Sequence, residues 1–109
     1  MFVVLYRWKL KEGCEVLFSD GWSVVTRFYL EKFDSLGSRL HLGDDGIWYG
    51  YAQWKSAEQR ANAFEKRGEF LSDVEFVSSM EKMSQAVLET LPEIELNIVA
   101  DYLQLPLIR

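Results

Sequence analysis

The sequence predicts an α+β domain in which one four-stranded antiparallel sheet carries helices. Three observations lead to this prediction. Strand-like alternation occupies residues 2–10, an Asp-Gly turn joins two strand-like runs within residues 36–54, and helical periodicity separates these segments. With 109 residues, of which 49% are hydrophobic, the chain fits one domain spanning residues 1–109 with a substantial core.

The first strand is expected at Phe2–Leu10, where alternate side chains point to opposite faces. Both faces are apolar at its start, which is typical of a central strand covered on two sides. A turn at residues 11–13 then leads into a helix at Cys14–Phe33, whose wide apolar stripe is expected to lie flat on the sheet. Within this helix Gly21 costs about 1 kcal/mol relative to Ala, so it marks a close approach of the backbone to another element.

A hairpin at Leu36–Trp54 is expected around the turn Gly43–Gly46, because Asp-Gly tolerates positive φ. Large side chains on both faces of its strands place it in the middle of the sheet. On its second strand, Gly50 and Ala52 lie between two tryptophans on one face. These small residues leave a notch that a ligand or a packed side chain would fill.

Two further helices and a last strand complete the pattern. Ser56 and Gln59 form a capping box for a helix that Gly68 ends, and Ser72 and Glu75 form a second one. The second helix is expected to run over Asp73–Thr90 and to stop at Leu91-Pro92. The last strand is expected at Glu93–Leu103, and the apolar tail Leu103–Arg109 is expected to pack on a partner subunit.

The order strand, helix, strand, strand, helix pair, strand is the split βαβ, ferredoxin-like plan. Helices cover one face of such a sheet. Because the other face also carries apolar and aromatic groups, it needs a cover of its own. A second copy packed face to face through a two-fold interface would form a dimeric α+β barrel, so we expect a homodimer.

Composition excludes several functions. The formal net charge of −5 argues against nucleic-acid binding, which needs a basic surface. The apolar run at residues 2–6 is too short to cross a bilayer, so we expect a protein of the cytoplasm without membrane contact. A single cysteine, Cys14, forms no internal disulfide. No metal site is expected, because turn chemistry explains Asp44 and Asp45.

Arg39 and His41 share one face of a strand and are the candidate catalytic residues. A base such as His41 would take a proton from a bound substrate to form an anion, and a cation such as Arg39 would hold that anion. The competing interpretation is a polar patch at the dimer interface or in solvent.

Four aromatic residues are candidates for substrate binding. Trp22 and Trp54 would wall a slot for a flat molecule, and Tyr6 and Tyr51 would donate hydrogen bonds to a carbonyl. The alternative is that all four belong to the core. A cavity of a few hundred Å³ with Arg39 or His41 at its wall would favour an enzyme, and a closed core around Trp22 and Trp54 would favour a protein without catalysis.

Three segments resemble the antibiotic biosynthesis monooxygenase family. These are the opening Tyr6–Gly13 (YRWKLKEG), the pair Gly37-Ser38, and Tyr51–Ser56, where a Trp precedes a helix-capping Ser. The resemblance implies a dimeric α+β barrel with a small pocket between sheet and helices. It also implies oxidation of polycyclic aromatic substrates by O₂ without metal or flavin, and a related branch degrades haem.

The resemblance transfers only part of the family's site. Its strand-three Trp is Trp54, but the Asn that cofactor-free members place one turn of strand earlier falls at Gly50. The strand-one Asn of the haem-degrading branch falls near Tyr6, and the only histidine, His41, is outside the helical region where that branch has one. We therefore expect no cofactor.

Together these observations predict a cofactor-independent monooxygenase that acts on a small aromatic or quinone-like molecule with O₂. The alternative is a non-catalytic small-molecule-binding or dimerisation protein of the same fold.

Overall fold

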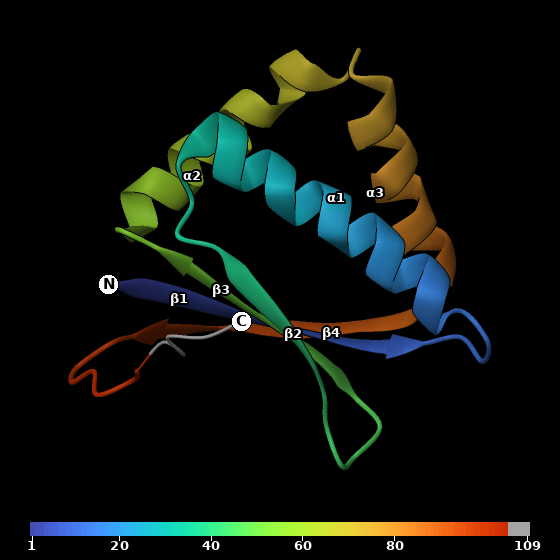
Figure 1. The fold of residues 1–109 in the computed structure, drawn as a ribbon, viewed down its shortest axis with the longest axis horizontal. Helices are drawn as coiled ribbons and strands as arrows, with labels where there is room; N and C mark the ends of the chain where they lie inside the picture. The colour runs from blue at the N-terminus through green and yellow to red at the C-terminus, as the bar shows by residue number, and fades with distance from the viewer. Residues whose placement is uncertain (105–109) are drawn as a thin grey trace.

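The computed structural model describes residues 1–104 and has the expected α+β, ferredoxin-like plan. One antiparallel sheet has the strand order β2-β3-β1-β4, and all the helices cover one of its faces (Figure 1). In chain order the elements are β1 (Phe2–Leu10), α1 (Glu15–Phe33), β2 (Ser38–Leu42), β3 (Trp48–Trp54), α2 (Ala57–Lys66), a 3-10 helix η1 (Arg67–Phe70), α3 (Val74–Ala86) and β4 (Val87–Asn97). The part of the tail at residues 105–109, expected to contact a partner, lies outside the described residues.

The hairpin forms as predicted, but only one of its two strands lies in the middle of the sheet. The Gly43 N–H donates to the Ile47 carbonyl at 2.8 Å, and Gly46 has the positive φ of 78° that the Asp-Gly pair suggested. The central strands are β1 and β3, whereas β2 is at the edge of the sheet. The expectation that both hairpin strands are central was therefore wrong for β2.

The boundary between α3 and β4 differs most from the expectation. The helix ends at Ala86 rather than Thr90, and the strand begins at Val87 rather than Glu93. Pairing explains the difference, because Leu10 lies opposite Val87 and Trp8 opposite Thr90, so β1 extends the sheet into the predicted helix. β-Branched Val87 and Thr90 suit a strand, and an edge strand tolerates Pro92.

The helix ends follow the predicted capping chemistry only in part. The Ser56 hydroxyl accepts from the Gln59 N–H at 3.0 Å, as expected. At α3 the cap is Asp73, which accepts from the Phe76 N–H at 3.0 Å, so the prediction of Ser72 was wrong. Gly68 does not end α2, because the chain continues through it as η1.

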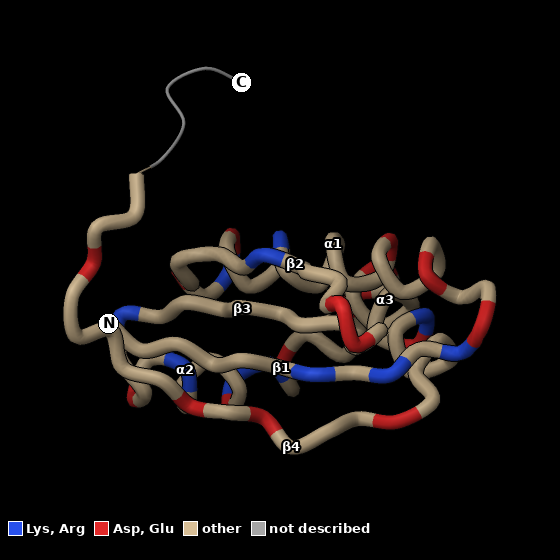
Figure 2. The backbone as a smooth tube through the Cα atoms, turned by 90° about the horizontal axis from the view of Figure 1, so that it is seen from below, with Lys and Arg blue, Asp and Glu red and all other residues tan. Residues whose placement is uncertain are grey.

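The two faces of the sheet have different surroundings. Phe2, Val4, Tyr6 and Trp8 of β1 face the helices, where they contribute to two apolar clusters. On the outer face the Lys9 Nζ lies 3.5 Å from the Glu89 carboxylate. Figure 2 shows that basic positions of β1 run beside acidic positions of β4 along the backbone. Within residues 1–104 every helix falls short of the length and apolarity that crossing a membrane requires.

Gly21 marks a close approach of helices, as its position in the sequence indicated. A Cβ atom there would lie 2.6 Å from the Ser79 carbonyl oxygen of α3 and 3.0 Å from the Met83 Cγ. Helix propensity alone would make Gly21→Ala stabilising by about 1 kcal/mol, but overpacking against backbone costs about 1–3 kcal/mol. We expect the second effect to win and the free energy of unfolding in urea to fall by roughly 0.5–2 kcal/mol.

The matched control for this prediction is Gly68→Ala. A Cβ atom at Gly68 meets nothing within 4 Å, so its stability should change little. Equal stability of the two variants would contradict the close contact between α1 and α3.

Candidate functional site

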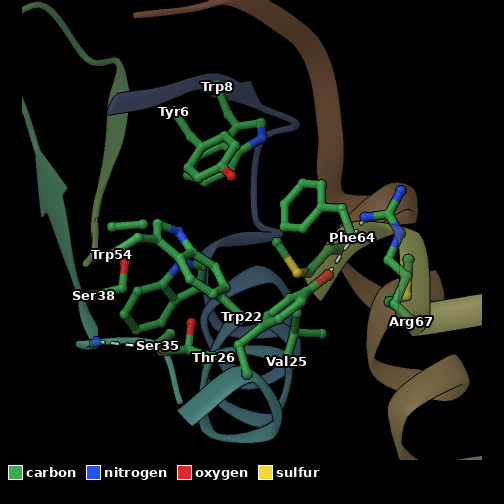
Figure 3. Close-up of a pocket in the computed structure, with 15 residues that line it drawn as sticks. Tyr6, Trp8, Trp22, Val25, Thr26, Ser35, Ser38, Trp54, Phe64 and Arg67 are labelled. Carbon is green, nitrogen blue, oxygen red and sulfur yellow. Dashed lines mark hydrogen bonds between the residues drawn. The ribbon is translucent and has the colours of Figure 1, made fainter. Parts of the chain in front are cut away.

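A cavity of about 310 Å³ lies between the sheet and the helices. This volume is at the lower end of the range for small-molecule sites. Its wall is mostly aromatic, and the rings come from β1, α1, β3 and α2: Tyr6, Trp8, Trp22, Tyr29, Trp54 and Phe64. Figure 3 shows Tyr6 and Trp8 on one side of the opening and Trp54 and Trp22 on the other.

Local sequence periodicity builds this wall. Alternation in β1 turns Tyr6 and Trp8 toward the helices, and helical spacing brings Trp22, Val25 and Tyr29 of α1 to the cavity. Of the two small residues on β3, Ala52 lines the cavity. Gly50 is instead covered by Trp8, because a Cβ atom at Gly50 would lie 2.9 Å from the Trp8 Cη2. A packed side chain therefore fills half of the predicted notch.

The indole N–H of Trp54 is buried without a hydrogen-bond acceptor in the part of the chain that the structure describes. The Trp54 side chain is 3% exposed, and its Nε1 has no hydrogen-bond partner among residues 1–104. Tyr29 and Phe64 contact its indole edge-on, with centroid distances of 5.9 and 6.3 Å. A buried N–H without an acceptor is costly, and packing of the indole against these rings offsets that cost.

A guanidinium from α2 holds the hydroxyl of Tyr6. The Arg60 Nε and Nη2 donate to the Tyr6 oxygen at 3.3 and 2.9 Å. The same Nη2 donates to the Glu93 carboxylate of β4 at 3.1 and 3.2 Å. Burial raises the pKa of the Tyr6 phenol above its usual value, and the Arg60 guanidinium opposes this rise without cancelling it. Tyr6 thus stays protonated at neutral pH.

A second arginine and tyrosine repeat this arrangement. The Arg67 Nη1 donates to the Tyr29 hydroxyl at 3.4 Å. Phe64 lies near both arginines, with the Arg60 and Arg67 guanidinium carbons 4.4 and 4.7 Å from its ring centroid. Such cation–π contacts each contribute about 0.5–1 kcal/mol at partly exposed sites. Arg67 also lines the cavity, so a positive charge borders it.

The structure divides the residues proposed from the sequence between two faces. Tyr6, Trp22 and Trp54 line the cavity. Arg39 and His41 are exposed on the outer face, paired across the strands with Tyr51 and Tyr49. The cavity therefore has the size expected of an enzyme site but lacks the base and cation that were expected at its wall, and Tyr51 is also outside it.

Sequence reasoning missed the residues of α2 and its extension. The signal was present, because Arg60, Phe64 and Arg67 recur at helical spacing on one face. Tyr29 falls on the apolar stripe of the helix predicted at Cys14–Phe33 and was not proposed as a site residue. None of the cavity-lining residues is a carboxylate or an imidazole, and the described part of the chain holds no group of three His, Cys, Asp or Glu that would bind a metal.

The element order and the cavity together define a ferredoxin-like α+β fold with a ligand-sized space beneath its helices. Among solved structures this fold matches antibiotic biosynthesis monooxygenase proteins, which confirms at the level of fold the resemblance that the sequence suggested. No family model and no curated protein sequence matches the chain.

Three solved structures illustrate the match. A candidate antibiotic biosynthesis monooxygenase from Bordetella bronchiseptica aligns with a TM-score of 0.72 at 12% identity, covering 91% of this chain and 97% of that one. SnoaB, a cofactor-independent oxygenase from Streptomyces nogalater, aligns with a TM-score of 0.70 at 10% identity, covering 94% and 97%. A candidate antibiotic biosynthesis monooxygenase from Nitrosomonas europaea has a TM-score of 0.69 at 10% identity, covering 92% and 100%.

Proposed function

We propose that this protein is a cofactor-independent monooxygenase that oxidises a small aromatic or quinone-like molecule bound in the cavity. The observation that carries the proposal is the aromatic wall with two tyrosine hydroxyls and a bordering guanidinium. Flat rings stack on such a wall, and the donors fix the position of an oxygen atom. The fold that the chain shares with SnoaB supports the same reaction class.

The reaction needs no external reductant if the substrate carries an acidic methylene, as an anthrone does. One atom of O₂ becomes the new carbonyl oxygen, the other leaves as water, and the substrate carbon supplies all the electrons. The enzyme's task is then to stabilise the substrate anion that gives the first electron to O₂. Hydrogen bonds and a nearby cation favour the anionic form.

In this proposal catalysis comes from stabilisation of the substrate anion and not from a base on the protein. No lining residue is a carboxylate or an imidazole, so the proton passes to water, while the Arg67 guanidinium lowers the pKa of the bound substrate. The rate should then rise with pH through the pKa of the substrate.

We test the proposal by measuring O₂ uptake of the metal-free protein with 1,8-dihydroxyanthrone. We expect one O₂ consumed per anthrone oxidised and a rate at least about tenfold lower for Arg67→Met, which removes the charge that borders the cavity. His41→Ala and Arg39→Met decide between the faces. Loss of uptake in these two variants would place the chemistry on the outer face and contradict a site in the cavity.

A homodimer is the second part of the proposal. The outer face of the sheet carries Leu5, Ile94 and Leu96 between polar groups, and a second copy of the chain would cover them. The barrel that the family resemblance implies is formed in this way. A cytoplasmic location remains our expectation for such an enzyme.

Non-catalytic ligand binding is the alternative function, and one observation favours it. The resemblance places an Asn side chain at Gly50, where this protein has only the Trp8 ring. Stable binding of the anthrone with no O₂ uptake at any pH would support this alternative over the enzyme.

A further inference from the structure

We propose that Arg60 makes the Tyr6 hydroxyl a hydrogen-bond donor toward the cavity, so that the site selects aromatic ligands with an acceptor oxygen. A carbonyl or a phenolate oxygen would meet this requirement. The inference deepens the proposed function, since it rests on the same cavity as the binding site. Tyr6 would touch the ligand, and Arg60 would act through Tyr6 as a positioning residue.

The direction of the Tyr6 proton follows from the groups around its oxygen. A phenol carries one proton and accepts through its lone pairs, whereas a guanidinium only donates. Two N–H groups of Arg60 point at this oxygen, from 3.3 and 2.9 Å, and occupy its acceptor side. The Tyr6 proton must then point away from Arg60, and within residues 1–104 no group accepts it.

Arg60 is itself fixed from two other sides. The Glu93 carboxylate accepts from its Nη2, and its guanidinium lies over the Phe64 ring. The Arg60 side chain is 14% exposed and that of Glu93 is 40% exposed, so the guanidinium is sheltered while its partner reaches solvent. A guanidinium held in this way keeps the Tyr6 proton from turning toward Arg60, so the hydroxyl donates on its other side.

A second tyrosine in the same wall points to the same ligand chemistry. The Tyr29 hydroxyl accepts from Arg67, and like Tyr6 it donates to no described residue. A hydrocarbon in the cavity would leave both phenol protons unpaired, which costs free energy at each hydroxyl that it takes from water, whereas a ligand with acceptor oxygens would pair them.

The protonation state of Tyr6 supports a donor role over a wide pH range. Burial raises its pKa, and the charged or titratable groups that face it are Arg60, Glu93 and Tyr29. The phenol therefore keeps its proton at neutral and mildly alkaline pH, the range in which binding would be measured.

Two probes of nearly equal shape test the inference. 2,3-Dimethyl-1,4-naphthoquinone carries two carbonyl oxygens, and 2,3-dimethylnaphthalene lacks them; the methyl groups keep the Cys14 thiol from adding to the quinone. Equilibrium dialysis against metal-free protein gives the ratio of the two affinities. We expect the quinone to bind at least about tenfold more tightly.

Tyr6→Phe and Arg60→Met should each reduce this ratio by about fivefold or more, with little change in the affinity for the hydrocarbon. The matched control is Arg27→Met, an exposed arginine on α1 whose loss should leave the ratio unchanged. Because the hydrocarbon reports on the integrity of the cavity, a purely structural effect of Arg60 would weaken both probes alike.

Each outcome has a distinct meaning. An unchanged ratio in both Tyr6→Phe and Arg60→Met, or binding of neither probe to the folded protein, overturns the inference. If the ratio falls as expected while 1,8-dihydroxyanthrone elicits no O₂ uptake, the inference stands and the proposed monooxygenase activity fails.

Discussion

Replacing Phe18 with alanine is expected to lower the free energy of unfolding by about 3–5 kcal/mol, the usual cost of removing a buried phenyl ring. Phe18 of α1 is fully buried, and its ring packs against Trp8 at 4.9 Å and Trp48 at 6.4 Å between centroids. Because both partners are large and held in the sheet, the space that is left would not close easily.

Urea unfolding followed by circular dichroism measures this loss. Val16→Ala is the control on the same helix, because Val16 is 72% exposed and its truncation should change stability by less than about 0.5 kcal/mol. A cost below about 1 kcal/mol for Phe18→Ala would mean that α1 does not pack on the sheet as described.

The second large effect concerns assembly. Ile94→Glu on β4 is expected to convert the proposed dimer into a monomer, with a dissociation constant raised by at least about 100-fold, because a two-fold interface would bury the new charge twice. Ile94 lies opposite Leu5 on the outer face and is 39% exposed, so the isolated subunit should tolerate the change.

Sedimentation equilibrium at micromolar concentration measures this shift. Val16→Glu places the same charge on the helical side and should leave the dimer intact. If the unmodified protein is already a monomer under these conditions, or if Ile94→Glu stays a dimer, the proposed interface on the outer face is wrong.

Much of the fold could be predicted because its signals are local. The Asp-Gly turn, the Ser56 cap and the apolar stripe of α1 each act within a few residues. The junction of α3 and β4 could not, because helical periodicity over residues 87–91 competed with pairing to β1, which is distant in sequence. Long-range pairing won, as tertiary contacts override local propensity.

The site was less predictable than the fold. Trp22 and Trp54 were chosen as flat walls and Tyr6 as a hydrogen-bond donor, and all three line the cavity. Arg39 and His41 were chosen because a base and a cation share one face of a strand. Which face of that strand meets the helices depends on its register with Ala52 and Gly50, and this register turns both side chains to the outer face. Arg60 and Arg67 were overlooked because arginines on a helix usually point to solvent, and here an aromatic ring draws them inward.

The crowding of indoles around one space has an optical consequence. The chain has four tryptophans, and Trp8, Trp22 and Trp54 all border the cavity. Three of the four indoles that give the protein its ultraviolet emission therefore lie beside whatever occupies that space. A quinone bound in the cavity should therefore quench the intrinsic tryptophan fluorescence, so binding can be followed without an added dye.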